Sequence, residues 1–302
     1  MSALFEVAVL LVLGRVLAAS GRLPPNTSAA LTGWVLYAAW PAAALQSTRL
    51  VRLDSAIVSG AAWLWGLFAV AVIAVAIAII CFGLRRPTAG AVLLASGAGS
   101  TAGFALPFIE RYCGAECVAQ AIVLSVLGGA LAIGVLGVGA SCVLSQGRVC
   151  ARLIVRHIVT FPPLVALVLG LVLPATALPD FVQVTVRDLA ATLAPISIVA
   201  VGMHLRTFPE RKRLAPIAAA LSFKLVLAPA GILLGFLLIG SELGNFGKLL
   251  VLLAAMPPLI SSIAMAREYN LEAELSAQIA AFGASLALVT VPLWGAALEL
   301  MA

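Results

Sequence analysis

Small, polar and proline residues interrupt two long apolar segments of this chain, and these residues could form a binding site. In the first segment, residues 91–112, Ser100 and Thr101 supply hydroxyl groups and Gly103 supplies flexible backbone. Pro107 suits the opening turn of a new helix, where a missing N–H leaves no bond unmade. We therefore predict that this segment is two half-helices separated by a break.

The second interrupted segment, residues 249–269, has the same character. Pro257 and Pro258 break it, and Ser261 and Ser262 follow. Unpaired backbone at membrane depth is tolerated only where protein or a water-filled cavity satisfies it, and paired interruptions are typical of transporter binding sites. A half-helix that begins at mid-membrane presents unpaired N–H groups, which favour an anion such as a carboxylate. The alternative is a pair of kinked helices that only pack.

Two charged residues fall inside predicted spans. Lys224 lies near the middle of its span, and a lysine at that depth must face protein or substrate. It could support an anion electrostatically or neutralise the negative end of a broken helix. Asp188 is our candidate for a proton-titrating group in coupling. Its alternative is an interfacial cap or an ion pair with Arg187.

The composition requires a membrane. Of 302 residues, 63% are hydrophobic and 10% charged, and the mean hydropathy is +1.17. The net charge of +6 lies in short loops, which indicates membrane topology and not nucleic-acid binding.

The cysteines lack a CxxC spacing and the histidines are His157 and His204, so we expect no metal site and no cofactor. No catalytic set is present, so an enzyme is not expected. Glu268, Glu272 and Glu274 indicate a solvated loop.

The apolar pattern predicts an all-α membrane protein with ten transmembrane helices in two halves of opposite topology, 1–147 and 148–302. Leu11-Val-Leu-Gly14 is echoed by Leu167-Val-Leu-Gly170, and Glu110-Arg-Tyr112 by Arg267-Glu-Tyr269. The predicted spans are 3–20, 27–48, 56–82, 88–109, 115–145, 152–174, 181–204, 213–239, 247–267 and 272–299.

The distribution of basic residues predicts the orientation. With the N-terminus outside, the cytoplasmic loops contain Arg22, Arg85, Arg86, Arg148, Arg152, Arg156, Arg206, Arg211, Lys212, Arg213 and Arg267. The opposite loops contain Arg49, Arg52, Arg111 and Lys248. This bias predicts that both termini lie on the extracytoplasmic side.

Several motifs resemble the auxin efflux carrier family, which includes plant PIN carriers and bacterial malonate and malate permeases. They are Ala266-Arg-Glu-Tyr-Asn270 after Met256-Pro257, Ser100-Thr101 through Leu106-Pro107 to Gly114, Leu23-Pro24 with Trp40-Pro41, Gly202-Met-His-Leu205, and Lys224-Leu-Val-Leu-Ala-Pro229. The likeness covers essentially the whole chain. Ser100 and Ser261 stand where relatives often carry Asn, and Ala105 where they carry Gly, so the substrate preference is expected to differ.

The resemblance implies a bacterial inner-membrane protein with the fold of sodium/proton antiporters and bile-acid symporters. Helices four and nine would cross as broken pairs. Helices one, two, six and seven would form a scaffold, and helices three to five and eight to ten a moving transport domain, in a homodimer.

The leading hypothesis is a secondary transporter of a small organic anion, a mono- or dicarboxylate, that works by an elevator-type motion. The alternative is a cation/proton antiporter or sodium-coupled symporter of the same fold. Such a carrier needs carboxylates beside the breaks, and residues 91–107 and 249–265 contain none. A membrane receptor would usually need an added soluble module, and none is recognisable.

Overall fold

The computed structural model describes residues 2–24, 26–99, 103–146, 151–173, 178–205, 211–240, 243–259 and 261–301. Within these ranges the regular elements are helices, and the β-type pairing is a single isolated bridge. The described residues therefore confirm the all-helical fold class.

Six uninterrupted helical stretches are long and apolar enough to cross a membrane. They are α2 (Thr27–Trp34) with η1 (Val35–Ala39) and α3 (Trp40–Ser47); α4 (Ser55–Phe82); α7 (Glu116–Leu124) with η2 (Ser125–Ala130), η3 (Ile133–Gly137) and α8 (Val138–Gln146); α11 (Asp180–Ala191) with α12 (Leu193–Met203); α13 (Leu214–Ser222) with η6 (Phe223–Leu227) and α14 (Ala228–Ile239); and α17 (Ala273–Leu300). A bent pair, α9 (Ala151–Val159) and α10 (Pro162–Val172), meets at 55° and adds a seventh if it is one span.

The surface of these helices is apolar, as lipid requires. Large side chains such as Ile80, Phe82 and Leu238 are about four-fifths exposed. A soluble protein of this size would not leave so many large apolar groups in water. The chain is therefore a multi-pass membrane protein.

Local sequence signals explain where the longest helix begins and ends. Asp54 caps α4 because its carboxylate accepts a hydrogen bond from the backbone N–H of Ile57 at 3.0 Å. Gly83 ends the helix in the left-handed conformation, with φ of 62°, which a glycine adopts without steric cost. Between them, Ser55–Phe82 runs without an interruption.

Both segments that the sequence marks as interrupted are interrupted in the structure. α5 (Arg86–Gly97) is followed by α6 (Leu106–Cys113), and α15 (Asn245–Ala255) by α16 (Ser261–Glu268). The two breaks lie side by side, since Gly99 and Pro258 form the isolated antiparallel bridge. Peptide groups released from one helix thus face peptide groups released from the other.

The remaining predicted span, 3–20, coincides with α1 (Ser2–Ala19), and helix ends elsewhere fall within a few residues of the predicted limits. The count of ten spans and the inverted repeat stay predictions, because only the uninterrupted stretches and the bent pair meet the criteria for a span.

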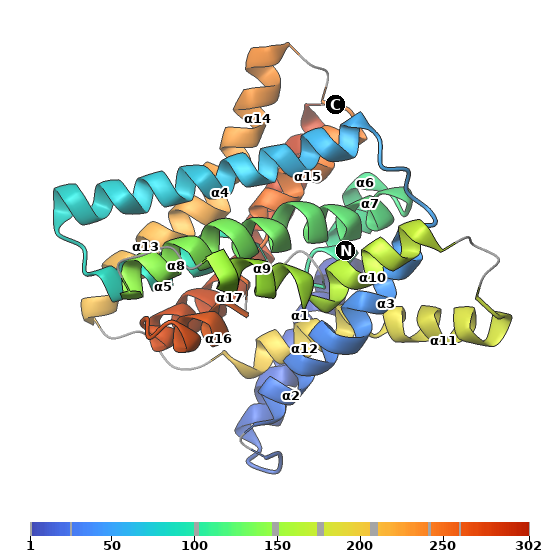
Figure 1. Ribbon diagram of the computed structural model, residues 1–302, viewed down its shortest axis with the longest axis horizontal. Helices are drawn as coiled ribbons and strands as arrows, with labels where there is room; N and C mark the ends of the chain where they lie inside the picture. Colours follow the sequence, from blue (N-terminus) through green and yellow to red (C-terminus); the bar gives the residue numbers. More distant parts are fainter. Residues whose placement is uncertain are drawn as a thin grey trace.

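The helices gather into two groups around the breaks (Figure 1). α1, α2, α3, α10, α11 and α12 pack on one another and form one group. α4, α5, α13, α14, α15, α16 and α17 form the other, in which α17 contacts both α5 and α15. Four π-helical segments, η1, η2, η3 and η6, interrupt the regular helices, and such segments often occur at functional sites.

Two glycines allow α1 and α12 to pack backbone against backbone. A side-chain carbon added at Gly202 would overlap the Leu11 carbonyl oxygen and lie 3.0 Å from the Leu11 Cα atom. One added at Gly14 would overlap the carbonyl oxygen of Val199. Because backbone atoms cannot move aside as a flexible side chain can, this contact requires glycine on both helices.

We expect Gly202→Ala to lower the free energy of unfolding by about 1–3 kcal/mol, since it forces the two backbones apart. Gly33→Ala is the matched control, because nothing lies within 4 Å of a carbon added at Gly33. Thermal unfolding of the purified proteins in detergent compares them. Equal midpoints for the two variants would contradict the close-packing argument.

Candidate functional site

A cavity of about 360 Å³ lies where the two groups of helices meet, and both breaks contribute to its wall. The first break provides Ala98, Gly99 and Gly103, and the second provides Leu259 and Ser261. The remaining wall comes from the α2–η1–α3 span, from η2 and η3, from the bend between α9 and α10, and from α12 and α16.

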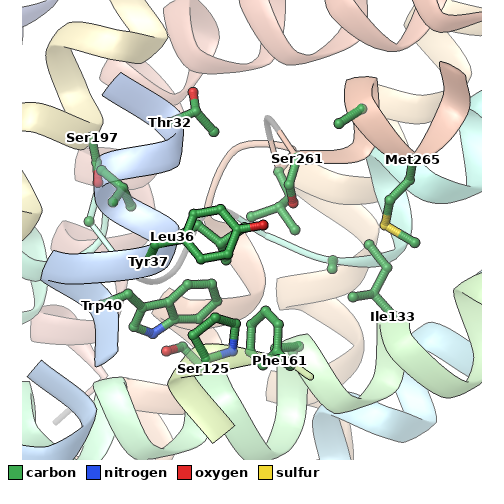
Figure 2. Close-up of a pocket in the computed structure, with 18 of the residues that line it drawn as sticks. Thr32, Leu36, Tyr37, Trp40, Ser125, Ile133, Phe161, Ser197, Ser261 and Met265 are labelled. Atoms are coloured by element: carbon green, nitrogen blue, oxygen red, sulfur yellow. The ribbon is translucent and has the colours of Figure 1, made fainter. Parts of the chain in front are cut away.

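Three of the π-helical segments line this cavity. η1 contributes Val35, Leu36 and Tyr37, while Ser125 comes from η2 and Ile133 from η3. An extra residue in a helical turn changes which side chains face a given direction. Figure 2 shows the ring of Tyr37 inside the cavity, with its hydroxyl directed toward Ser261.

Aromatic side chains form one continuous wall. The indole of Trp40 meets the ring of Phe161 edge to face, with centroids 5.4 Å apart. The imidazole of His157 also stacks on Phe161, with ring centroids 6.2 Å apart. Edge-to-face and offset-stacked rings hold one another at defined angles. A flat or apolar part of a ligand would find a preformed surface here.

Two buried hydrogen-bond donors on the wall have no partner among the described residues. They are Nε1 of Trp40 and Oγ of Ser197, whose residues are 7% and 8% exposed. An unpaired polar group in a buried place costs about 1–3 kcal/mol, so native structures usually supply a partner. Both atoms are almost fully covered, so a ligand with acceptor oxygens would supply one only after a shift of the wall.

Titratable groups on the wall are few. Among the described lining residues they are His157, Tyr37 and Glu268. Glu268, which the sequence placed in a solvated loop, is the last residue of α16 and lines the cavity. Among the described lining residues Glu268 is therefore the one carboxylate, and no lysine or arginine accompanies it.

The structure brings some of the predicted site residues to the cavity. Gly103 and Ser261 line it. Ser100 and Thr101 lie outside the described residues. A carbon added at Gly103 would overlap the side chain of Ser197, so the first break lies directly on α12.

Other predicted site residues lie in the breaks but are not among those that line the cavity. Pro107 occupies the first turn of α6, as the sequence predicts. Pro257 and Pro258 are buried, and a carbon at Gly283 would overlap the ring of Pro258. The hydroxyl of Ser262 donates to the carbonyl of Leu259 at 2.6 Å. These residues shape the breaks.

Lys224 lies behind the cavity wall, in η6. It is 4% exposed, and its Nζ atom would be 3.1 Å from a carbon added at Gly99. Met256, at the C-terminal end of α15, lies against the same point, and α5 ends at Gly97. No hydrogen bond or ion pair joins the ammonium to another described residue. This position suits neutralisation of two negative helix ends, one of the two roles predicted for it.

Asp188 lies away from the cavity, on α11. Its Oδ1 atom is 3.7 Å from Nε of Arg187, and the carboxylate side chain is 68% exposed. The ion pair considered as an alternative is therefore present. The coupling role of Asp188 stays a prediction, since the described cavity wall does not include it.

Sequence reasoning gave no role to Trp40, Phe161, Ser197 or His157. Trp40 enters the sequence analysis only as part of the Trp40-Pro41 motif. The sequence analysis predicts no bend between Phe161 and Pro162. A proline in an apolar run after a histidine was the available signal for that bend. Nothing in the sequence distinguishes Ser197 from other serines in apolar helices.

Comparison with known proteins agrees with a transport role. Residues 146–295, just under half of the chain, match the profile of the family described as "Membrane transport protein". A protein of Methanocaldococcus jannaschii, named as an uncharacterized transporter, is 25% identical over 225 residues, which are 71% of this chain and 70% of that relative. Together with the membrane helices, these similarities support a membrane transporter.

The contact between Gly103 and Ser197 predicts how stability changes when the larger side chain is moved from one position to the other. Gly103→Ala should destabilise the protein by about 1–3 kcal/mol, because the new methyl group collides with Ser197. Adding Ser197→Gly should restore part of this loss, since it removes the colliding atoms. Thermal unfolding of the two single variants and the double variant gives the coupling energy. Strictly additive effects would show that the two residues do not touch.

Proposed function

We propose that this protein is a secondary transporter that carries a small organic anion, a mono- or dicarboxylate, across the cytoplasmic membrane. The observation that carries the proposal is the pair of unpartnered donors, Trp40 Nε1 and Ser197 Oγ, in a cavity lined by both breaks. A carboxylate accepts several hydrogen bonds at once, so it is a suitable partner for donors of this kind. The transport similarity of the chain agrees with this proposal.

The size and lining of the cavity favour a small substrate with an apolar part. A volume of about 360 Å³ is at the lower end of the range for small-molecule sites. Trp40, Phe161 and Leu36 offer apolar surface, while the donors and the hydroxyls of Ser261 and Tyr37 are few. The donors would bind the carboxylate and the aromatic wall the carbon skeleton.

The proposed mechanism is alternating access of an elevator type. The group that contains α1, α2, α3 and α10–α12 would be the scaffold, and the group that carries the breaks would move against it. This assignment includes ten spans in inverted halves, crossing of the broken helices, and a homodimer, all of which the family resemblance implies. The cavity between the two groups supports it, because a substrate held there would face both.

Under the predicted orientation, this structure would be the inward-facing state. His157 and Glu268 lie on the cavity wall next in sequence to Arg156 and Arg267, which the positive-inside rule assigns to the cytoplasm. The cavity would then open toward the cytoplasm in this state. Both termini would be extracytoplasmic.

A cation/proton antiporter or sodium-coupled symporter is the second candidate, and Glu268 is the observation in its favour. A sodium site would need several oxygen ligands close together. Among the described lining residues Glu268 is the one carboxylate, so the wall offers little for a cation. The experiment below therefore includes sodium chloride as a test of this candidate.

The first experiment measures thermal stability of the purified protein with malonate, malate, pyruvate, benzoate or sodium chloride. A ligand that binds the folded state at about a hundred times its Kd adds about 2.7 kcal/mol. We expect stabilisation by at least one carboxylate and its reduction in Ser261→Ala, since Ser261 lines the cavity. Ser262→Ala is the matched neighbour, because its hydroxyl bonds the Leu259 carbonyl instead. Stabilisation by sodium alone would favour the cation carrier.

Removing the indole N–H tests the donor. Trp40→Phe keeps an aromatic ring against Phe161 but deletes the unpartnered donor, so carboxylate affinity should fall about tenfold, or about 1.4 kcal/mol. Trp34→Phe is the control, because the Trp34 indole donates to Thr192 and is not on the cavity wall. Affinities come from ligand titrations of the stabilisation. Equal losses in both variants would remove Trp40 from the proposed site.

A further inference from the structure

The charges on the cavity wall are poorly suited to an anion unless one of them changes. Among the described lining residues, Glu268 is the one carboxylate, and its anion would repel a second carboxylate. The ammonium of Lys224 lies behind Gly99, beside the C-terminal ends of α5 and α15, whose partial negative charges oppose it. Among the described lining residues, the group that can gain a positive charge by taking up a proton is the imidazole of His157.

The imidazole is held in place at the wall. It stacks on Phe161 with an interplanar angle of 18°, and its Cδ2 atom would be 3.2 Å from a carbon added at Gly134. Glycine at position 134 thus leaves room for the ring against η3. Glu268, on α16, lines the same cavity. Packing therefore fixes the position of the imidazole nitrogens, which are the atoms that can bind a proton.

Few other charges face this ring. The elements packed against α9 are α8, η3 and α10, and among their described residues the titratable group is Cys142 on α8. Arg152 and Arg156, on α9 itself, are exposed. Tyr37 shares the cavity wall. Protonation of His157 is thus the step that changes the net charge of the wall from negative to neutral.

On the premise of the anion transport proposed above, we propose that His157 is the proton-binding residue of the carrier, and that the anion binds together with a proton on its imidazole. A ring nitrogen takes the proton from water on the side of entry. The imidazolium offsets Glu268 and attracts the carboxylate, so the transported load is one anion plus one proton. On the other side the carboxylate leaves and the nitrogen returns the proton to water.

This coupling fixes the direction of the pH dependence. An anion that binds only the protonated form loses affinity about tenfold per pH unit once the pH exceeds the range in which histidine titrates. Affinity should therefore be highest at acid pH. A proton gradient directed into the cell would drive accumulation of the anion.

The test measures the Kd of pyruvate and benzoate, whose carboxylates stay ionised throughout, from about pH 6 to about pH 8.5. The unmodified protein should lose at least tenfold in affinity over this range. His157→Gln should bind weakly and with no pH dependence. His204→Gln is the matched control, since His204 bonds Ser28 and is not on the cavity wall. It should behave as the unmodified protein.

Glu268→Gln gives a second, opposite readout that keeps the test decisive even where His157→Gln fails to fold. Loss of the negative charge should strengthen pyruvate binding at high pH and reduce the pH dependence. Binding in weakly buffered solution should also take up protons in the unmodified protein and not in His157→Gln.

The outcomes separate this inference from the proposed function. Binding of neither probe at any pH, with no response to the other carboxylates, would overturn both. Binding with a constant Kd across the pH range would leave the anion site intact and overturn the coupling. Loss of pH dependence in Asp188→Asn, with its retention in His157→Gln, would transfer the proton to Asp188 and also overturn the inference.

Discussion

Unsatisfied backbone at membrane depth is the constraint on which the rest of this structure depends. Lipid offers no hydrogen bonds, so a helix can be broken there only if protein or enclosed water replaces the bonds that are lost. The two breaks meet this requirement together, because Gly99 and Pro258 bring them into direct pairing. A single break in either segment would leave its peptide groups without that partner.

Small residues permit this pairing by letting large groups approach the breaks. Three large or polar groups lie against glycines of the first break. The ring of Phe68 lies against Gly97, and the ammonium end of Lys224 lies against Gly99. The side chain of Ser197 lies against Gly103. The first break is thus enclosed by an aromatic ring, a cation and a hydroxyl from three different helices. The cation has a physical reason to be there, because two helices end at this point and their carbonyl groups carry partial negative charge. A lysine buried for that purpose contributes less positive potential to the cavity than its formal charge suggests.

The sequence predicted much of the fold, because long apolar runs, glycines and prolines determine helix length and interruption locally. α4 begins after its Asp54 cap and ends before Gly83, close to the predicted limits. The cavity wall was far less predictable. Helices that are apolar on nearly all sides give no periodic signal for the inward face, and π-helical segments such as η1 alter that face further. Trp40, Phe161 and Ser197 therefore come to line one cavity through tertiary packing of helices that are distant in sequence.

The contacts within and between the two groups of helices differ in a way that bears on motion. Inside one group, α1 and α12 interlock through Gly14 and Gly202, where backbone lies on backbone and sliding would drive atoms together. Between the groups, the first break meets α12 where Gly103 lies against Ser197 and the carbonyl of Leu193, and the cavity occupies the space beside it. A boundary that includes a cavity resists displacement less than an interlocked pair of helices does. The same boundary contains both unpartnered donors on one side and the Ser261 hydroxyl on the other, so a bound carboxylate would connect the two groups. In the proposed mechanism, relative motion of the two groups would change which side of the membrane the bound carboxylate faces.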